Sequence, residues 1–413
     1  MYYYSLDNNV LISESEYNGL IPISEQEARG AGMPVFLLNR LDPLASRRKF
    51  CVSDPSLAFI KDEGIELICK QTAPGKQLPQ WLVDMINHRK IASVNTLYPG
   101  WYKALSEELP SKWRINVVGL GDVGGMLVAG LRLLGGDCIE AIGIFDIDHN
   151  KVARWEFEAN QISSPDSGQK MPPVVPLTEE QLFDCDMFVF CVTVGVPPLG
   201  ETRDVRIAQF EGNSLIVSLY AKKARQKNFG GIFAVVSDPV DLLCKSAFLY
   251  SNIGENGNMD FKGLASDRII GYGLGVMHAR ALYYSDTDPE LCRYREQGRA
   301  FGPHGEGLII ADSLIDYNNE LSLRLTEKAC KANMAVRDTG FKPYIAPALS
   351  SGALSIISTI KGQWHYSTTY MGGVYWGSRN RLLPSGVELE RFEPDAVLYS
   401  RIKESYERLG AAL

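Results

Sequence analysis

Short apolar runs alternate with stretches of helical periodicity through the middle of the chain, and this alternation is its first structural signal. Residues 115–118 form a run typical of a strand buried on both faces. Helical apolar spacing follows over 126–134, and a second apolar run over 141–145 ends on Asp146. Residues 150–161 predict a helix with charge on one face. This order predicts a βαβ unit.

Further apolar runs extend the pattern. Residues 187–196 predict a central parallel strand, and 213–219 and 231–244 are two more buried-strand patterns, of which the second strand ends at Asp238-Pro239. Together they predict an α/β fold with a Rossmann-type, doubly wound parallel sheet over roughly 114–245. Residues 313–333 predict a long outer helix, and the aromatic residues 363–380 predict late antiparallel strands, as in an α+β domain.

The first 113 residues are the least readable part of the chain. They hold short apolar segments between turns and a stretch of helical spacing over 77–94, and they are too apolar for a disordered tail. We therefore predict an N-terminal extension over 1–113, a Rossmann domain over 114–265 and a catalytic domain over 266–413. Whether the extension is a separate small domain or wraps around the main body stays open.

Composition narrows the class of protein. The chain has 413 residues, 22% charged and 45% hydrophobic, which is typical of a globular protein of two or three domains. A net charge of −7 without a basic cluster argues against a nucleic-acid or membrane partner. The eight cysteines show no zinc spacing. They predict reduced thiols in a cytoplasmic protein, with no metal site.

The turn after the first strand carries the clearest chemistry. Gly119 permits a tight turn, Gly121 lets a pyrophosphate approach the backbone, and Gly124 lets the helix lie close to the strand. The N–H groups of the helix N-terminus would meet the phosphates. Asp146, 22 residues beyond Gly124, is placed to bind a ribose 2′-hydroxyl and to repel a 2′-phosphate. These features predict an NAD site; the alternative is a packing turn without a ligand.

Four stretches resemble the L-lactate/malate dehydrogenase family. VVGLGDVGG with FDID resembles the family's nucleotide turn and ribose acid, and VTVGVPPLGETRD resembles its mobile active-site loop. VVSDPVDLL resembles its SNPVD segment, and RIIGYGLGVMHARAL with FGPHGEGLII is similar to its histidine and arginine stretches. Their order agrees with the family over roughly 114–410. The resemblance implies NAD, a small 2-hydroxy or 2-oxo acid substrate, and a homodimer or homotetramer.

The resemblance also assigns roles by position. His304 matches the catalytic histidine, which accepts the hydroxyl proton as hydride leaves the same carbon. Arg280 matches the arginine that holds the substrate carboxylate, and Arg203 matches the loop arginine that polarises the carbonyl. The remaining predicted cofactor positions are Asp122, Val123, Val194 and Gly195.

Two positions depart from the family. Met277 stands where the family has the aspartate that orients its histidine, and Asp238 stands where it has the asparagine that contacts the substrate carbonyl. One hypothesis is that Asp238 supplies the carboxylate that Met277 lacks, and so binds the substrate and serves catalysis. A second is that His278 takes a role of its own. The alternative to both is a site that is inactive or serves different chemistry.

The specificity loop departs as well. Malate enzymes carry an additional arginine early in this loop, where the chain has Val196-Pro197-Pro198-Leu199. A second substrate carboxylate would be buried without a partner there, so we expect a substrate with an apolar side chain. Residues 342–354 resemble the family's substrate-pocket helix but contain prolines, which indicates a reshaped pocket.

The sequence thus predicts an NAD-dependent 2-hydroxy acid dehydrogenase. One alternative is an NAD-binding sensor or assembly protein on the same fold. The other is an NAD-dependent glycosidase with a metal held by cysteine and histidine, for which Cys191, Cys244 and His278 are candidates; the absence of ligand spacing argues against it.

Overall fold

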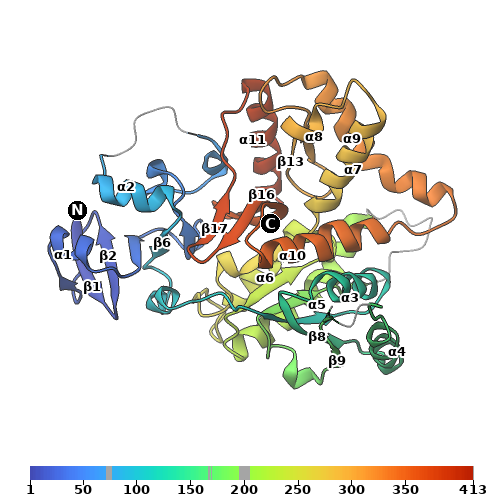
Figure 1. Ribbon diagram of the computed structural model, residues 1–413, viewed down its shortest axis with the longest axis horizontal. Coiled ribbons are helices and arrows are strands. Elements are labelled where there is room, and N and C mark those ends of the chain that lie inside the picture. Colours follow the sequence, from blue (N-terminus) through green and yellow to red (C-terminus); the bar gives the residue numbers. More distant parts are fainter. Residues whose placement is uncertain (71–76, 166–167, 169, 195–204, 413) are drawn as a thin grey trace.

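The computed structural model describes residues 1–412 apart from 71–76, 166–167, 169 and 195–204, and gives only the backbone of 205–208. The described strands form a six-stranded sheet, a nine-stranded sheet and a two-stranded sheet. Figure 1 shows the six-stranded sheet at the N-terminal end of the molecule and the nine-stranded sheet in the main body.

Six parallel strands make up the larger part of the nine-stranded sheet. They are β7 (Trp113–Val118), β8 (Ile139–Phe145), β9 (Val174–Pro176), β10 (Met187–Phe190), β11 (Ile232–Val235) and β12 (Ile269–Gly271). Their order is β12-β11-β10-β7-β8-β9, and every neighbouring pair is parallel. The chain runs outward from β7 to β9 and then returns to the other side of β7. The predicted doubly wound sheet is confirmed, with its topological switch point between β7 and β10.

Three antiparallel strands continue the same sheet. They are β15 (His365–Met371), β16 (Val374–Leu383) and β17 (Gly386–Leu389), and β15 pairs with β12. The predicted late antiparallel strands over 363–380 are therefore confirmed. The boundary that we predict between residues 265 and 266 falls between β11 and β12, which are neighbours in this sheet.

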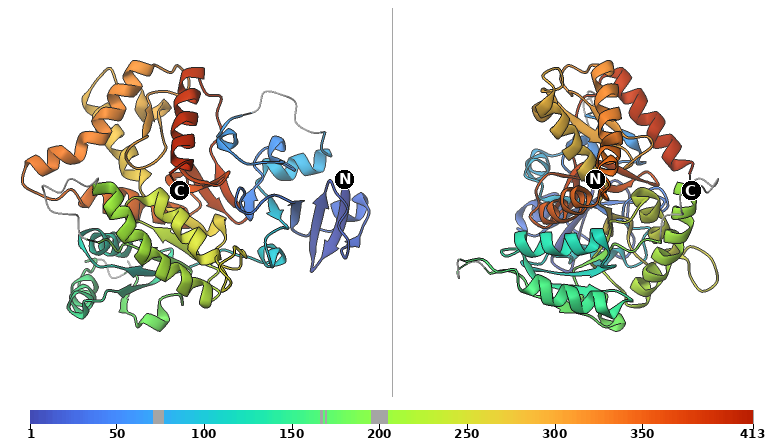
Figure 2. Two further views of the ribbon diagram at one scale, coloured as in Figure 1. Left: turned by 180° about the vertical axis from the view of Figure 1, so that it is seen from behind. Right: turned by 90° about the vertical axis from the view of Figure 1, so that its right-hand side faces the viewer.

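Helices cover both faces of the sheet. Ile115 and Val117 of β7 share a core cluster with α3, whereas Val118 shares another with α5 and α6. Figure 2 brings α5 and α6 to the front in its view from behind. The described helices of the main body are α3 (Asp122–Leu134), α4 (His149–Asn160), α5 (Val205–Gln226), α6 (Val240–Asn252), α7 (Leu274–Thr287), α8 (Tyr294–Gln297), α9 (Asn319–Asp338), α10 (Leu354–Ile360) and α11 (Ala396–Gly410). None of the helices in the described part of the chain is long and apolar enough to cross a membrane.

One of the predicted strands is wrong, because residues 213–219 lie inside α5. The strand predicted to end at Asp238-Pro239 is confirmed as β11, and α6 begins directly after it at Val240. In α5 the buried residues Val217, Ala221 and Ala224 recur at helical spacing, but Leu215 is 69% exposed. Exposed leucines made a helical pattern look like a continuous apolar run. The strand predicted over 187–196 is also shorter, because β10 ends at Phe190.

The first 113 residues contain a sheet of their own. Its strands are β1 (Tyr2–Leu6), β2 (Asn9–Ser13), β3 (Ile21–Pro22), β4 (Val35–Asn39), β5 (Lys49–Cys51) and β6 (Ile91–Asn95), and two of its helices are α1 (Glu25–Gly30) and α2 (Gln80–Asn87). β2, β4 and β6 are parallel, and every residue in them is buried. A sheet this deeply buried is covered on both faces, as parallel sheets usually are.

This N-terminal unit is fixed to the main body by charged and backbone contacts. Arg48 forms ion pairs with Glu107 and Asp267, and Arg268 also pairs with Glu107. The three side chains Arg48, Glu107 and Asp267 are each at least four-fifths buried. Close to these ion pairs, a Cβ on Gly386 of β17 would come within 3.0 Å of the Phe50 backbone in β5.

Candidate active site

The turn after β7 has the geometry that its glycine spacing predicts. Gly119 has φ +91°, and a Cβ there would come within 2.9 Å of the Cys191 backbone in the neighbouring strand end. A Cβ on Gly124 would come within 1.9 Å of the Gly119 carbonyl oxygen, whereas a Cβ on Gly121 would meet nothing within 4 Å. Packing therefore requires glycine at 119 and 124, and Gly121 presents an open face at the N-terminus of α3. These residues fit the pyrophosphate of a dinucleotide.

Asp146, which follows β8, is hydrogen-bonded to the backbone of this turn. Its Oδ2 accepts the Leu120 N–H at 2.8 Å, and its Oδ1 accepts the Asp148 N–H at 2.9 Å. The carboxylate thus lies beside the glycine turn, where a ribose would follow the pyrophosphate. Asp122 begins α3, and its carboxylate pairs with Lys342 Nζ at 3.0 Å.

His304 and Asp238 are in contact. Asp238 follows β11, and His304 lies between β13 (Arg299–Phe301) and β14 (Ile309–Ala311). The distance from His304 Nδ1 to Asp238 Oδ1 is 3.1 Å. Burial lowers the pKa of His304, but the charge and hydrogen bond of Asp238 outweigh it, so the pKa lies above its usual value. The structure therefore brings a carboxylate to this histidine, as hypothesised, from a different element than Met277.

A second carboxylate, which the sequence analysis missed, lies behind His304. Asp241, in the first turn of α6, accepts the Thr368 hydroxyl at 2.6 Å and the backbone N–H of His304. Its side chain is almost fully buried. Burial raises the pKa of Asp241 to about 6, although both hydrogen bonds and the charge of His304 oppose the rise. The signal was present in the sequence as an acid three residues beyond Asp238.

Asn213 holds two strand ends together and was also missed, because its segment was predicted as a strand. Its Nδ2 donates to the Asp238 carbonyl oxygen at 2.7 Å, and its Oδ1 accepts the Val194 N–H at 2.8 Å. The side chain is fully buried. It therefore fixes the backbone of Asp238 against the segment that follows β10.

Arg280 has no ionic partner among the described residues. Its Nη1 lies 3.4 Å from Met277 Sδ and 3.4 Å from the Ala329 carbonyl oxygen. Burial lowers the pKa of Arg280, while the nearby Asp238 charge opposes the shift. A partly buried guanidinium with only weak partners is suited to bind an anion. Met277 itself is buried in the apolar cluster beneath α7.

His278 is partly buried and packs against aromatic side chains. Its Nδ1 lies 2.8 Å from the Tyr294 hydroxyl, and its ring stacks on Tyr366 with centroids 4.2 Å apart. Burial lowers the pKa of His278 to about 4, with smaller contributions from nearby arginines. A neutral, enclosed imidazole does not support the hypothesis that His278 takes a catalytic role. In the part of the chain that the structure describes, no group of three potential metal ligands occurs.

Some predicted positions cannot be placed. Arg203, Gly195 and the specificity-loop residues 196–199 lie outside the described residues. The described site residues come from the carboxyl ends of β7, β8 and β11, from α7 and from the segment before β14.

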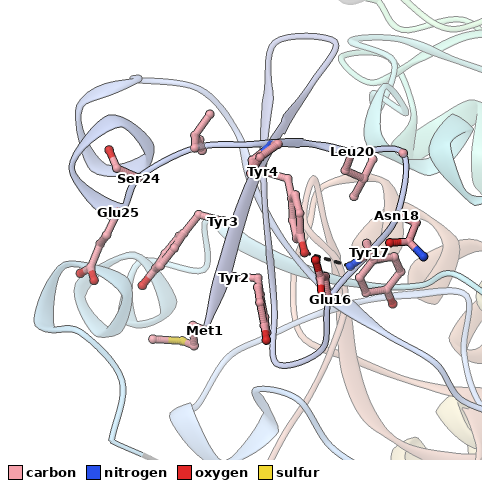
Figure 3. Close-up of a pocket in the computed structure, with 13 residues that line it drawn as sticks. Met1, Tyr2, Tyr3, Tyr4, Glu16, Tyr17, Asn18, Leu20, Ser24 and Glu25 are labelled. Atoms are coloured by element: carbon pink, nitrogen blue, oxygen red, sulfur yellow. Dashed lines mark hydrogen bonds between the residues drawn. The ribbon is translucent and has the colours of Figure 1, made fainter.

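A separate hollow of about 500 Å³ lies in the N-terminal unit. Figure 3 shows Tyr3 pointing toward Glu25 on one side, while Tyr2, Tyr4 and Tyr17 gather on the other. All of its lining residues fall within the first 25, so it contains none of the residues predicted for the active site.

The chain is similar in sequence to known L-lactate dehydrogenases. No family model matches the chain. An L-lactate dehydrogenase 2 of Listeria monocytogenes serotype 4b (strain F2365) is 23% identical over 240 residues, which are 56% of this chain and 71% of the relative. An L-lactate dehydrogenase of Mycoplasma genitalium is 28% identical over 202 residues, which are 48% of this chain and 57% of the relative.

Solved structures show the same fold. A lactate dehydrogenase from a Medee basin deep-sea metagenome has a TM-score of 0.59 at 19% identity, covering 73% of this chain and 97% of its own. The malate dehydrogenase of Picrophilus torridus has a TM-score of 0.57 at 16% identity, covering 72% and 95%. The chain is therefore similar in sequence to L-lactate dehydrogenases and has the fold of the lactate and malate dehydrogenase structures, with an additional N-terminal sheet.

Proposed function

We propose that the chain is an NAD-dependent oxidoreductase that interconverts a 2-hydroxy acid and a 2-oxo acid. The observation that carries the proposal is the contact between His304 and Asp238, with the unpaired guanidinium of Arg280 nearby. A proton donor and an anion clamp beside an open glycine turn are the parts that this reaction requires. The similarity to L-lactate dehydrogenases supports the same reaction class.

The chain's own residues would bind and orient the substrate. When bound, NADH supplies the hydride that reaches C2 of the 2-oxo acid. Gly121 and Asp146 would hold the cofactor, and Arg280 would hold the substrate carboxylate through parallel N–H bonds. Arg203 would polarise the carbonyl, as the family resemblance implies.

His304 would move the proton. Because its Nδ1 bonds Asp238, Nε2 is the nitrogen left to donate to the carbonyl oxygen, and no described residue bonds to it. Asp238 would keep the ring in one orientation and stabilise the imidazolium, the task for which Met277 has no carboxylate. The raised pKa of His304 favours the protonated donor, and therefore reduction, at neutral pH.

We also propose which class of 2-oxo acid the chain reduces and which oligomer it forms. The loop sequence Val196-Pro197-Pro198-Leu199 offers no cation for a second carboxylate, which supports an apolar 2-oxo acid over oxaloacetate. A homodimer or homotetramer stays a prediction, and light scattering coupled to size exclusion measures it.

The test is NADH oxidation with pyruvate, 2-oxobutyrate, 2-oxoisocaproate and oxaloacetate, with NADH affinity measured on the same sample. We expect turnover of an apolar member that His304→Gln abolishes while NADH affinity is kept. The matched control is His88→Gln, since His88 is an exposed histidine of the N-terminal unit. NADH binding without turnover of any member would favour the sensor alternative, to which the buried Met277 points. Loss of NADH binding altogether would contradict both.

A further inference from the structure

Lys49 is a buried cation with few hydrogen-bond partners. It lies in β5 of the N-terminal unit, and only 4% of the residue is exposed. Among the described residues, its Nζ has one hydrogen-bond partner, the Ala104 carbonyl oxygen at 3.0 Å. An ammonium group has three hydrogens to donate, so two of them have no acceptor in this part of the chain. A buried charge in this state is costly unless a further group satisfies it.

The charged groups around Lys49 do not balance. Arg48 and Arg268 share the carboxylates of Glu107 and Asp267 at the junction with the main body. With Lys49, this buried cluster holds three positive charges and two negative charges. Burial lowers the pKa of Lys49 to about 8, and the two guanidinium groups act against the two carboxylates, which raise it. At pH 7 the ammonium group is therefore still mostly charged.

The neighbouring pair of Arg47 and Glu63 does not offset the excess positive charge. The two side chains are almost fully buried and pair at 3.0 Å, so together they are neutral. Arg268 adds another unused donor, because its buried Nε has no hydrogen-bond partner among the described residues. The junction thus combines one net positive charge with unused N–H donors on two different cations.

A small hollow lies beside these groups. Every charged residue of the cluster except Arg48 lines it, and the other lining residues, such as Leu109, Ile232 and Leu382, have no polar side chain. Its volume is about 10 Å³, which is about the space of one water-sized group. Phosphate or a carboxylic acid is too large for it, whereas a monatomic anion fits. Apolar walls would strengthen the attraction between such an anion and the two cations.

We propose that this junction binds one chloride ion. The ion would accept hydrogen bonds from Lys49 Nζ and Arg268 Nε and would cancel the excess positive charge. Because the hollow is formed by both the N-terminal unit and the main body, only the folded chain offers this site. Chloride would therefore stabilise the attachment of the N-terminal unit. A water molecule in the hollow would satisfy the donors but not the charge, and stability would then not depend on chloride.

The experiment measures thermal unfolding of the full-length protein in sodium chloride and in sodium gluconate at the same ionic strength. Equal ionic strength keeps the screening of all surface ion pairs constant, so only binding of the anion differs. We expect the Tm to be higher in chloride by roughly 2 °C or more, with a response that saturates as chloride replaces gluconate. Equal Tm values in the two salts would overturn the proposal.

Lys49→Met is the decisive variant, since it keeps the length of the buried side chain and removes the charge and the donors. The chloride response should disappear in Lys49→Met and persist in Lys61→Met, which changes an exposed lysine of the same unit. Lys49→Gln is the second variant, should the first fail to fold. Glu107→Gln raises the excess to two positive charges and should enlarge the response. A full chloride response in both Lys49 variants would overturn the proposal.

Discussion

Thr368 on β15 donates its hydroxyl to Asp241 on α6 at 2.6 Å, and the same carboxylate accepts the backbone N–H of His304. One buried acid thus connects the antiparallel part of the sheet, the helix after β11 and the segment that carries the proposed proton donor. Its charge also raises the pKa of His304, together with that of Asp238. Asp241 has the contacts of a positioning residue.

Asp241→Asn tests this role. The amide can still accept the His304 N–H, but the negative charge is gone, so the pKa of His304 should fall. We expect kcat to decrease roughly tenfold with NADH affinity unchanged. NMR titration of the labelled histidine gives the pKa directly. A drop in kcat without any shift of the pKa would show that Asp241 acts only through packing.

The pH dependence of reduction follows from the His304–Asp238 contact. Reduction needs the protonated imidazole, so kcat/KM for a 2-oxo acid should fall as pH rises through a pKa above the usual 6.5 of histidine. Asp238→Asn removes the largest cause that raises this pKa, and the falling limb should move to lower pH. The pH profiles of both proteins check this. An unmoved limb in the variant would mean that another group controls the rate.

Alanine substitutions at Gly121 and Gly124 form a matched pair of variants that separate cofactor binding from stability. Gly124→Ala places a methyl group 1.9 Å from the Gly119 carbonyl oxygen, so it should cost about 1–3 kcal/mol of unfolding free energy. Gly121→Ala meets no protein atom within 4 Å, and its φ of −72° suits alanine. It should keep stability and weaken NADH binding. Thermal unfolding and NADH titration of both variants separate the two effects. Unchanged NADH affinity in Gly121→Ala would contradict the open cofactor face.

Arg280 should contribute to binding of the 2-oxo acid and not to binding of NADH. Arg280→Gln removes the unpaired guanidinium, and we expect kcat/KM for a 2-oxo acid to fall by roughly 100-fold or more, while NADH affinity stays the same. Arg280→Lys restores the charge without the planar pair of donors and should recover only part of the activity. Arg154→Gln, on the exposed face of α4, is the control. Full activity in Arg280→Lys would argue against a bidentate clamp.

The buried ion pairs between the N-terminal unit and the body predict an acid-sensitive junction. Burial alone would raise the pKa of Glu107, but Arg268 and Arg48 lower it to about 2. Because this pKa is depressed from 4.5, the stabilisation is complete above that value and is lost as pH falls from about 4.5 to 2.

Glu107→Gln leaves two buried guanidinium groups without this carboxylate and should cost about 3 kcal/mol or more. Chemical denaturation at pH 7 and pH 3 measures both effects. The difference between the wild type and the variant should shrink at pH 3. An equal difference at both pH values would assign the loss to packing.

The parts of the fold and of the site that could be predicted from the sequence are those that depend on neighbouring residues. The glycine turn and Asp146 were predicted because a strand, a tight turn and a helix impose requirements on neighbouring residues, and Gly119 and Gly124 meet them through backbone contacts. The fold class followed from the same alternation. The contact between His304 and Asp238 was a hypothesis that only a resemblance suggested, since 66 positions separate the two residues.

Tertiary contacts explain what was missed. Asn213 was assigned to a strand because exposed leucines on α5 completed an apolar run, so its bond to Asp238 could not be foreseen. Asp241 was read as part of a family motif, and its function became visible only with Thr368, which is 127 positions away. Polar contacts between residues that are distant along the chain leave no periodic pattern in the sequence.

The contact between Gly386 and Phe50 has a consequence for the solubility of the main body. β17 is the outermost strand at its end of the nine-stranded sheet, and outer strands present unpaired backbone groups to other chains. The N-terminal unit packs beside this strand with β5, and Arg89, two residues beyond α2, pairs with Glu388 in β17. The N-terminal unit therefore covers part of this edge, which would hinder edge-to-edge pairing with other chains. A chain without residues 1–113 would expose that edge.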